Sequence, residues 1–149
     1  MQRLTQNQGG WFMKKQQLFP LLAVLVLLAA GSVQAQNGGV KANIPFDFTA
    51  GSKTLPAGEY RITAMSDAGG VLWVAGSGFS KGFVGSQAVE KIAAATSTRL
   101  VFHRYGNRYF LYQIWVEGEN RGRELPRTRL EKEVASNARP SSVAVLASK

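Results

Sequence analysis

The side chain best suited to proton transfer is His103, which is the only histidine in the chain. An imidazole group titrates near neutral pH, which suits a general base. Catalysis would also need a nucleophile or an orienting acid, and neither lies nearby in the sequence. We therefore expect a half-buried structural histidine between Val101 and Tyr105.

Asp47 and Glu59 are candidates for a carboxylate pair of the kind that glycosidases use. Isolated carboxylates on an exposed sheet are far more often ordinary surface residues. The chain has no cysteine and only one histidine, so thiol catalysis, disulfides and His-His metal pairs are excluded. No stretch has the spacing of a phosphate-binding or calcium-binding loop. We expect no catalytic residue, no metal site and no cofactor.

Arginine and aromatic residues are interleaved between residues 99 and 115. Such side chains bind sugars and anionic polymers by stacking and by cation–π contact. Four more arginines lie between residues 121 and 129, among several glutamates. The alternative is a buried core flanked by solvated arginines and neutralised ion pairs. The binding surface predicted from the two groups consists of Arg104, Arg108, Tyr109, Trp115, Arg121 and Arg123.

Residues 1–35 have the pattern of a Sec signal peptide. Lys14 and Lys15 precede an uninterrupted apolar run at residues 21–30, and Val33-Gln34-Ala35 resembles a signal-peptidase site. The apolar run is shorter than the ~20 residues that a membrane span needs. We expect cleavage after Ala35, with no membrane anchor in the mature protein.

Met13 directly precedes the two lysines, so we expect it to be the true start of the chain. Cleavage after Ala35 removes Arg3, Lys14 and Lys15 with no acidic residue, and the net charge falls from +9 to +6. For an exported basic domain we expect no nucleic-acid partner, but an anionic envelope glycan, a membrane surface or another exported protein. The alternative is a plain solvated surface. The sequence leaves the choice between periplasm and exterior open.

With 149 residues, 45% of them apolar, the chain fits one globular domain. We expect that domain over residues 36–138, followed by a flexible tail or an edge strand at residues 139–149. Short β-rich segments separated by turns predict an all-β fold. The expected architecture is a small antiparallel β-sandwich or a partly open β-barrel with one short C-terminal helix.

Alternating apolar and polar residues predict a strand over residues 40–49, either at a sheet edge or broken at Pro45. Further strands are expected at residues 59–66, 71–75 and 79–89. A polar loop is expected at residues 117–122. The C-terminal helix is expected at residues 126–135, with Pro126 in its first position, Leu130, Val134 and Ala138 as an apolar stripe, and Arg127 spaced to pair with Glu131.

The segment at residues 99–116 predicts a β-hairpin with a type II′ turn at Gly106-Asn107, because Gly tolerates the positive φ that this turn requires. A two-residue turn fixes the register, with Tyr105 opposite Arg108 and Val101 opposite Tyr112. In that register, Ile114 shares a face with His103, whereas Trp115 shares a face with Phe102. Both faces are largely apolar, so we expect the hairpin at the centre of a sheet.

Five short motifs lie between residues 40 and 134: Ile44-Pro45-Phe46-Asp47-Phe48, Leu55-Pro56-Ala57-Gly58-Glu59-Tyr60, Leu100-Val101-Phe102-His103-Arg104-Tyr105-Gly106, Tyr109-Phe110-Leu111 and Arg123-Glu124-Leu125-Pro126. In this combination the chain resembles a family of small exported proteins of Gram-negative environmental bacteria. The resemblance implies a signal peptide followed by one β-rich domain. It brings no activity, ligand or site residue.

Three classes of function remain open. The leading one is an exported non-enzymatic domain that binds an envelope component or a partner protein. The second is a self-assembling structural or surface subunit, because the alternating N-terminal strand or the apolar C-terminal tail could add to a neighbour's sheet. The third, a hydrolytic enzyme, lacks a convergent set of acid, base and nucleophile.

Cleavage of the leader gives the first testable prediction. We expect the protein recovered from the envelope fraction to begin at Gln36, because Ala35 ends the predicted signal-peptidase site. N-terminal sequencing and intact mass measure this directly. An intact mass that retains residues 13–35 would contradict the prediction and favour a membrane anchor.

Overall fold

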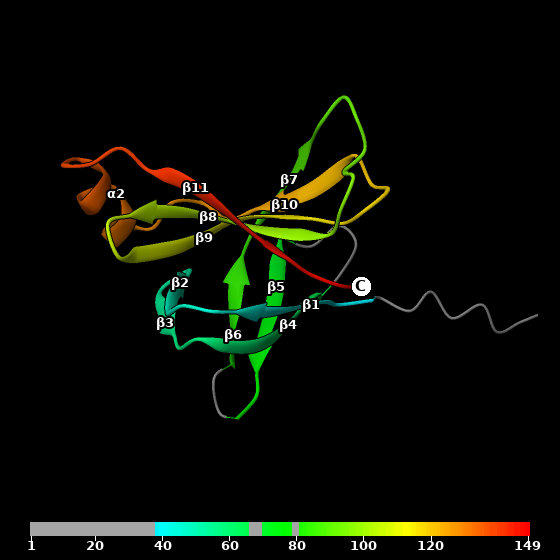
Figure 1. Cartoon of the computed structure of the whole chain (residues 1–149), viewed down its shortest axis with the longest axis horizontal. Coiled ribbons are helices and arrows are strands. Elements are labelled where there is room, and N and C mark those ends of the chain that lie inside the picture. The colour runs from blue at the N-terminus through cyan, green and yellow to red at the C-terminus, as the bar shows by residue number, and fades with distance from the viewer. Residues whose placement is uncertain (1–37, 66–69, 79–80) are drawn as a thin grey trace, which may run out of the picture. The chain divides into compact units, whose positions relative to one another are not determined.

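The computed structural model of the protein describes residues 38–65, 70–78 and 81–149. The predicted leader and the predicted start at Met13 lie outside the described residues. The described chain is all-β with one short helix, and its strands form two sheets (Figure 1). The fold class predicted from the sequence is therefore confirmed.

The smaller sheet, which we call sheet A, has the antiparallel strand order β1-β4-β5-β6. β1 ends directly before Pro45, because proline has no N–H to donate to a neighbouring strand. β1 also lies at a sheet edge, as its sequence predicts. The strand bounds are Val40–Ile44 for β1, Gly58–Ala64 for β4, Val71–Gly76 for β5 and Lys81–Gly85 for β6.

The larger sheet, sheet B, has seven strands, with the main order β11-β8-β9-β10-β7. β2 joins β9 through one parallel bridge between Thr49 and Phe110, and β3 pairs with β2. Residues 141–146 form an edge strand of this sheet. The bounds are Phe48–Ala50 for β2, Lys53–Leu55 for β3, Gln87–Glu90 for β7, Arg99–Tyr105 for β8, Arg108–Trp115 for β9, Arg121–Glu124 for β10 and Ser141–Leu146 for β11.

Two local predictions are wrong, one because the chain changes sheets and one because the strand signal is missing from the sequence. The strand expected at residues 79–89 is divided at Ser86, where the chain leaves β6 in sheet A and enters β7 in sheet B. The loop expected at residues 117–122 contains the start of β10, which pairs with both β7 and β9. Gly122 packs directly on the Trp115 ring, where a Cβ atom would collide with it. β10 has no apolar alternation, so its sequence carries no strand signal.

The hydrophobic core lies between the two sheets. Leu55 and Tyr60 of the Leu-Pro-Ala-Gly-Glu-Tyr motif enter it, and the Tyr60 hydroxyl donates a 2.7 Å hydrogen bond to the Pro56 carbonyl. Phe46 stacks on Tyr109 at a centroid distance of 3.8 Å at the border of the core. The buried core residues are Val40, Ala42, Ile44, Phe48, Ala50, Leu55, Tyr60, Ile62, Leu72, Val74, Val84, Leu100, Phe102, Leu111, Ile114 and Leu125.

The β8–β9 hairpin confirms the predicted turn, since Gly106 has a φ of 64° and no other described residue of the turn has a positive φ. The register is as predicted from Tyr105 opposite Arg108 to Phe102 opposite Leu111. Beyond that point the prediction is wrong, because Val101 lies opposite Gln113. Tyr112 is an extra residue in β9, which is a β-bulge.

The bulge exchanges the faces of the residues that follow it. Ile114 turns into the core between the sheets, whereas Trp115 turns to the outer face of sheet B, the reverse of the predicted arrangement. A single inserted residue has this effect because side chains alternate along a strand.

Helix α2, Arg129–Ala135, is shorter than predicted and begins after Thr128 instead of at Pro126. The Thr128 hydroxyl accepts the Glu131 N–H at 3.2 Å, which is a helix-capping bond. The predicted Arg127–Glu131 pair is present, with 3.8 Å between Nε and Oε1. The most buried residue of the helix is Glu131, whereas Leu130 of the predicted apolar stripe is 43% exposed.

The turn yields a stability prediction. Gly106→Val places a β-branched residue at positive φ, so we expect the free energy of unfolding to fall by about 1–3 kcal/mol in urea titrations. Gly85→Val is the matched control, because a Cβ at either position meets no atom within 4 Å and only Gly106 has a positive φ. Equal losses in the two variants would contradict the turn assignment.

Candidate functional site

The outer face of sheet B carries a buried polar cluster that the sequence did not predict. Glu131 of α2 lies over β8, where its Oε1 atom is 2.7 Å from His103 Nδ1 and accepts a 3.3 Å hydrogen bond from the Tyr105 hydroxyl. Because a carboxylate oxygen accepts, Nδ1 is the donor in the bond to His103. Arg127 lies 3.8 Å from the same carboxylate. An orienting acid for His103 is therefore present, 28 residues away in the sequence.

A second carboxylate, that of Glu124, extends the cluster along β9 and β10. It accepts hydrogen bonds from Gln113 at 2.7 Å and from Gln87 at 3.3 Å, and it also bonds with the Tyr112 hydroxyl. The Tyr112 ring stacks on His103 at a centroid distance of 3.9 Å. Tyr112 thus connects the two carboxylate groups.

Three ionisable groups of the cluster have shifted pKa values. Burial acts to raise the pKa of Glu124, but the hydrogen bonds from Gln113, Tyr112 and Gln87 outweigh it and lower that pKa below its usual range. Burial raises the pKa of Tyr105 and of Tyr112, and the neighbouring carboxylates raise both further. The folded state therefore favours an ionised Glu124 beside protonated phenols.

The cluster contains the residue types of a proton-transfer site, but it is buried and packed as a structural contact. His103 and Glu131 are both buried, and neither of the two described cavities is lined by His103. No set of three His, Asp or Glu side chains among the described residues is arranged to hold a metal ion. The contacts of Glu131 join α2 to β8, so their evident effect is to hold the helix on sheet B.

The structure does not bring the six residues of the predicted binding surface together. Arg104 and Tyr109 share the core-facing side of the hairpin tip, with the guanidinium 5.5 Å from the ring, whereas Arg108 lies on the other side near α2. Trp115 is only 1% exposed and has Lys91 4.1 Å above its ring, so it is not part of an open surface.

The remaining charged candidates lie apart from the hairpin. Arg121 pairs with Glu90 of β7 at 2.8 Å, and Arg123 is half-buried in β10. Asp47 accepts the Ala57 N–H at 2.8 Å, which fixes the loop before β4. Glu59 instead lies on β4 opposite Asn43. The two carboxylates of the expected pair thus belong to different local structures.

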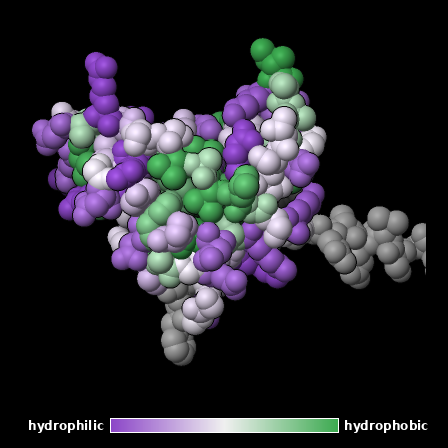
Figure 2. Space-filling model, in the orientation of Figure 1, coloured by the Kyte–Doolittle hydropathy of each residue, from purple (hydrophilic) through white to green (hydrophobic). Residues whose placement is uncertain are grey.

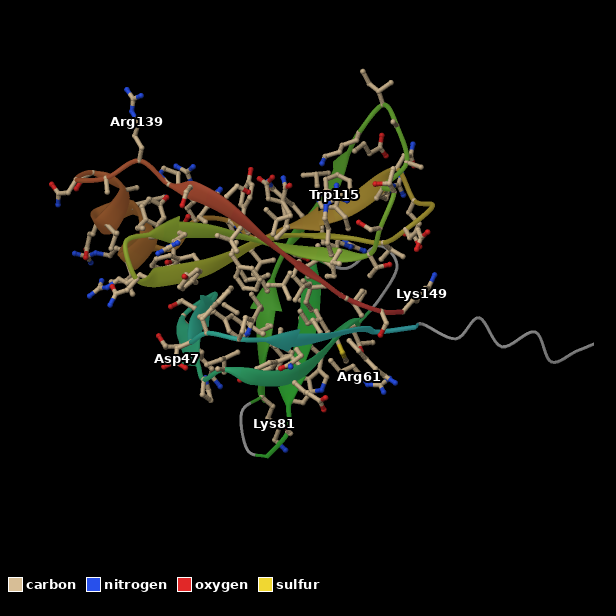
Figure 3. The ribbon with its side chains drawn as sticks, viewed as in Figure 1. Asp47, Arg61, Lys81, Trp115, Arg139 and Lys149 are labelled. Carbon is tan, nitrogen blue, oxygen red and sulfur yellow. The ribbon has the colours of Figure 1, made fainter. Side chains whose placement is uncertain are left out.

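A row of cations crosses the outer face of sheet A. The register places Lys41 opposite Arg61, Arg61 opposite Ala75, and Ala75 opposite Lys81. Like charges directly opposite each other on neighbouring strands are destabilising. None of the ion pairs found among the described residues involves Lys41, Arg61 or Lys81. Figure 3 shows Arg61 and Lys81 on sheet A, well separated from Trp115 on sheet B.

An aromatic row lies beside the cations, two residues away along each strand. It consists of Trp73 and Phe83, which lie opposite each other with ring centroids 4.6 Å apart, and Thr63 lies opposite Trp73 on the other side. Phe83 is 65% exposed, and the adjacent Met65 and Val71 are 55% and 40% exposed. These are three of the six exposed large hydrophobic residues found in the described part of the chain.

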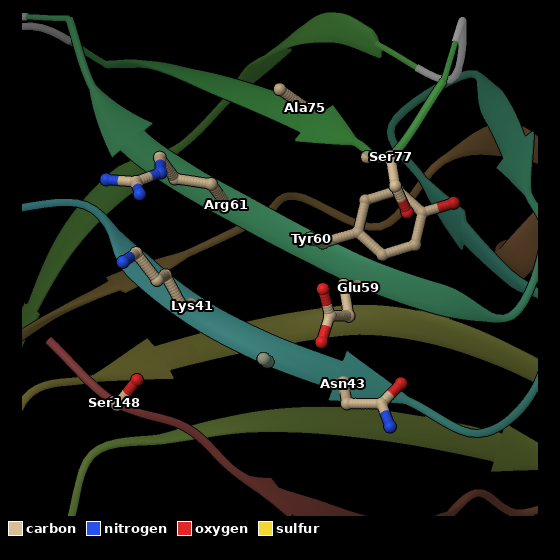
Figure 4. A pocket seen from close by; sticks show the side chains of 10 residues that line it. Lys41, Asn43, Glu59, Tyr60, Arg61, Ala75, Ser77 and Ser148 are labelled. Atoms are coloured by element: carbon tan, nitrogen blue, oxygen red, sulfur yellow. The ribbon is translucent and has the colours of Figure 1, made fainter.

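A groove of about 540 Å³ lies on the other side of the cation row. Asn43 of β1, Glu59 of β4 and Ser77 after β5 line it together with Lys41 and Arg61. Figure 4 shows these side chains along the neighbouring strands. Sheet A therefore offers cations, an exposed Phe83 ring beside the half-buried Trp73 ring, and polar hydrogen-bonding groups on one face.

The sequence contains a signal for this face of sheet A. In each strand of sheet A the buried residues alternate with these outward ones, for example Leu72 and Val74 around Trp73. An aromatic residue at the outward position of an alternating strand is a candidate for an exposed ring. The pairing of the strands, which the sequence does not give, brings Trp73 beside Phe83.

Comparison with protein-family models, with curated proteins and with solved structures finds no match to this chain. Among the described residues, no helix has the length and apolar character needed to cross a membrane.

The anchoring role of Glu131 gives a stability prediction. Glu131→Gln removes a buried charged acceptor from His103 and Tyr105, so we expect the free energy of unfolding to fall by about 1–3 kcal/mol. Glu133→Gln is the control, because Glu133 forms an exposed ion pair with Arg129 and such pairs contribute little. Chemical denaturation of both variants measures the difference. Equal, small effects would contradict an anchoring role.

The lowered pKa of Glu124 predicts an acid-dependent loss of stability. A carboxyl group whose pKa is lower in the folded state contributes stability above its unfolded pKa, and this contribution is lost as the pH falls through the folded pKa. We expect Glu124→Gln to flatten the decline of unfolding free energy below the usual value of 4.5. The exposed Glu117 provides the control variant, Glu117→Gln. An unchanged pH profile for Glu124→Gln would contradict the assignment.

Proposed function

We propose that the chain is exported and acts as a non-enzymatic β-domain that binds an acidic polysaccharide of the cell envelope on the outer face of sheet A. The observation that carries this proposal is the position of the cation row directly beside the aromatic row. Lys41, Arg61 and Lys81 supply positive charge, and Trp73 and Phe83 supply ring faces.

Charge complementarity favours an anionic ligand. Lys41 and Arg61 lie directly opposite each other, and no acid among the described residues forms an ion pair with either one. A carboxylate or sulfate held between them relieves their repulsion and gains charge-assisted hydrogen bonds. The basic net charge of the chain, which is +9 in full and +6 after the predicted cleavage, attracts the same class of ligand over a longer range.

The aromatic row favours a sugar over a simple anion. A sugar ring has an apolar face that packs on an aromatic ring, while its hydroxyl groups remain free for hydrogen bonds. Successive outward positions on a strand are about 7 Å apart. An acidic sugar carries its charge and its apolar face on one residue, so it can contact both rows together. Asn43, Glu59 and Ser77 in the groove can bond to hydroxyl groups of the next sugar.

Titration with an oligogalacturonate, a chain of carboxylated sugars, tests the proposal by calorimetry. We expect binding by the wild type, and a loss of about tenfold or more in affinity for Trp73→Ala, because the ring contact disappears. A neutral malto-oligosaccharide of equal length serves as the ligand control, and we expect it to bind much more weakly.

Arg61→Ala and Arg108→Ala form a matched pair of variants, because each removes one exposed arginine and the same charge. We expect Arg61→Ala to weaken binding and reduce its salt dependence, and Arg108→Ala on the hairpin to leave both unchanged. If Arg108→Ala weakens binding as much as Arg61→Ala, the ligand responds only to net charge or binds the hairpin, and the assignment to sheet A is wrong.

A further inference from the structure

Strand β11 leaves one open backbone edge in sheet B. It is the last strand of the sheet and pairs with β8 on one side only. Ala147 donates its N–H to Thr98 on the β8 side, whereas Ser148 exchanges two hydrogen bonds with Lys41 of β1 on the opposite side. Those two bonds are the only backbone bonds on that side among the described residues.

The direction of the backbone groups identifies which residues face the open edge. N–H and C=O groups of successive residues in a strand point to opposite sides. The backbone N–H and C=O groups of Ser148 point away from β8, and those of Leu146, Ala144 and Ser142 therefore point the same way. Within the described part of the chain, these three residues therefore present donors and acceptors in a row that no other strand pairs with.

This edge lacks the features that prevent strand addition. Proteins protect edge strands with charged side chains, prolines or short length. β1 carries Lys41, β6 carries Lys81 and β7 carries Glu90, whereas the six residues of β11 include no charge and no proline. Leu146 is 73% exposed, and Figure 2 shows hydrophobic residues gathered where β11 crosses this face of the molecule.

We infer that β11 pairs antiparallel with the β11 strand of a second copy of the chain, about a two-fold axis at Ala144. In an antiparallel pair, residues directly opposite each other have their side chains on the same face of the sheet. The two-fold axis between two identical strands must therefore pass at a residue and not between two residues. With the axis at Ala144, each Ala144 lies opposite the Ala144 of the other copy, and each Ser142 lies opposite the Leu146 of the other copy. This register uses all three outward-facing residues, whereas centring on Val143 or Val145 uses only two of them from each copy.

The charge of the chain favours this contact between copies over others. Two copies repel each other because the chain is basic, with a net charge of +9 in full and +6 after the predicted cleavage, so a contact between them must use an uncharged surface. β11 supplies such a surface over Ser141–Leu146. Strand pairing alone gives a contact below the size of a stable interface, so the dimer is weak and depends on concentration. The inference does not rest on the proposed ligand.

Sedimentation equilibrium tests the dimer, with the protein purified after expression of the full chain. We expect mass to rise from monomer toward dimer between about 10 µM and 1 mM. Ala144→Pro removes an N–H from the open edge without removing a bond to β8, so we expect it to remain monomeric. Ala144→Val keeps that N–H and is the control, which we expect to dimerise.

A wild type that stays monomeric over this range overturns the inference, and so does an Ala144→Pro variant that dimerises like the wild type. Should Ala144→Pro fail to fold, Ala144→Lys places a charge at the same position and takes over the test with the same expectation. Circular dichroism of each variant shows whether it has folded.

Thiol cross-linking tests the register, because the chain has no cysteine of its own. In the proposed dimer Ala144 faces its own copy, whereas the two Ser142 residues are about 13 Å apart along the strands. We expect a short bifunctional thiol reagent to link Ala144→Cys efficiently and Ser142→Cys poorly. Equal linking of the two variants, or stronger linking of Ser142→Cys, overturns the proposed register.

Discussion

The extra residue in β9 decides what each side of sheet B carries. Because Tyr112 has no opposite residue in β8, Ile114 turns into the core and Trp115 turns to the outer face. The same bulge keeps Tyr112 on the outer face, where it stacks on His103 and bonds to Glu124. α2 then covers this face through Glu131. The core and the helix cover the two faces of sheet B, whereas the outer face of sheet A carries three of the exposed large hydrophobic residues of the described chain, Met65, Val71 and Phe83.

The two faces differ in how their charges are satisfied. On sheet B, Glu124 and Glu131 each accept more than one hydrogen bond, and these bonds stabilise the fold. On sheet A, Lys41 and Arg61 are adjacent cations whose arrangement does not stabilise the sheet. Residues that reduce stability without an internal compensation are characteristic of binding sites, because selection retains them for function. This contrast is the reason for placing the proposed ligand on sheet A.

Much of the fold could be predicted from local patterns. The alternation in β1, the proline that ends it and the glycine turn of the hairpin each act within a few residues, so the sequence displays them. The bulge at Tyr112 and the crossing at Ser86 depend on strand pairing that no local pattern encodes. The Thr128 cap is different, because Thr128 and Glu131 have the spacing of a capping box. The predicted register placed Trp115 on the same face as Phe102, whereas the bulge turns it to the outer face, where it is buried.

The candidate site was harder to predict than the fold, because its parts come from separate strands. Trp73 and Phe83 meet only through the β5–β6 pairing, and Lys41 meets Arg61 only through the β1–β4 pairing. Glu131 reaches His103 from a helix 28 residues away. Arginine and aromatic residues are dense in the sequence of the hairpin, but the structure divides them between the two faces of sheet B.

The central claim is that sheet A, and not the hairpin, is the binding surface. The most direct measurement is the change in backbone amide NMR shifts during titration with oligogalacturonate. Binding at sheet A predicts that the largest shifts fall in β4, β5 and β6, around Arg61, Trp73 and Phe83, with little change at Arg104 and Arg108 of the hairpin. Shifts concentrated at the hairpin tip, or spread evenly over all basic residues, would contradict the claim.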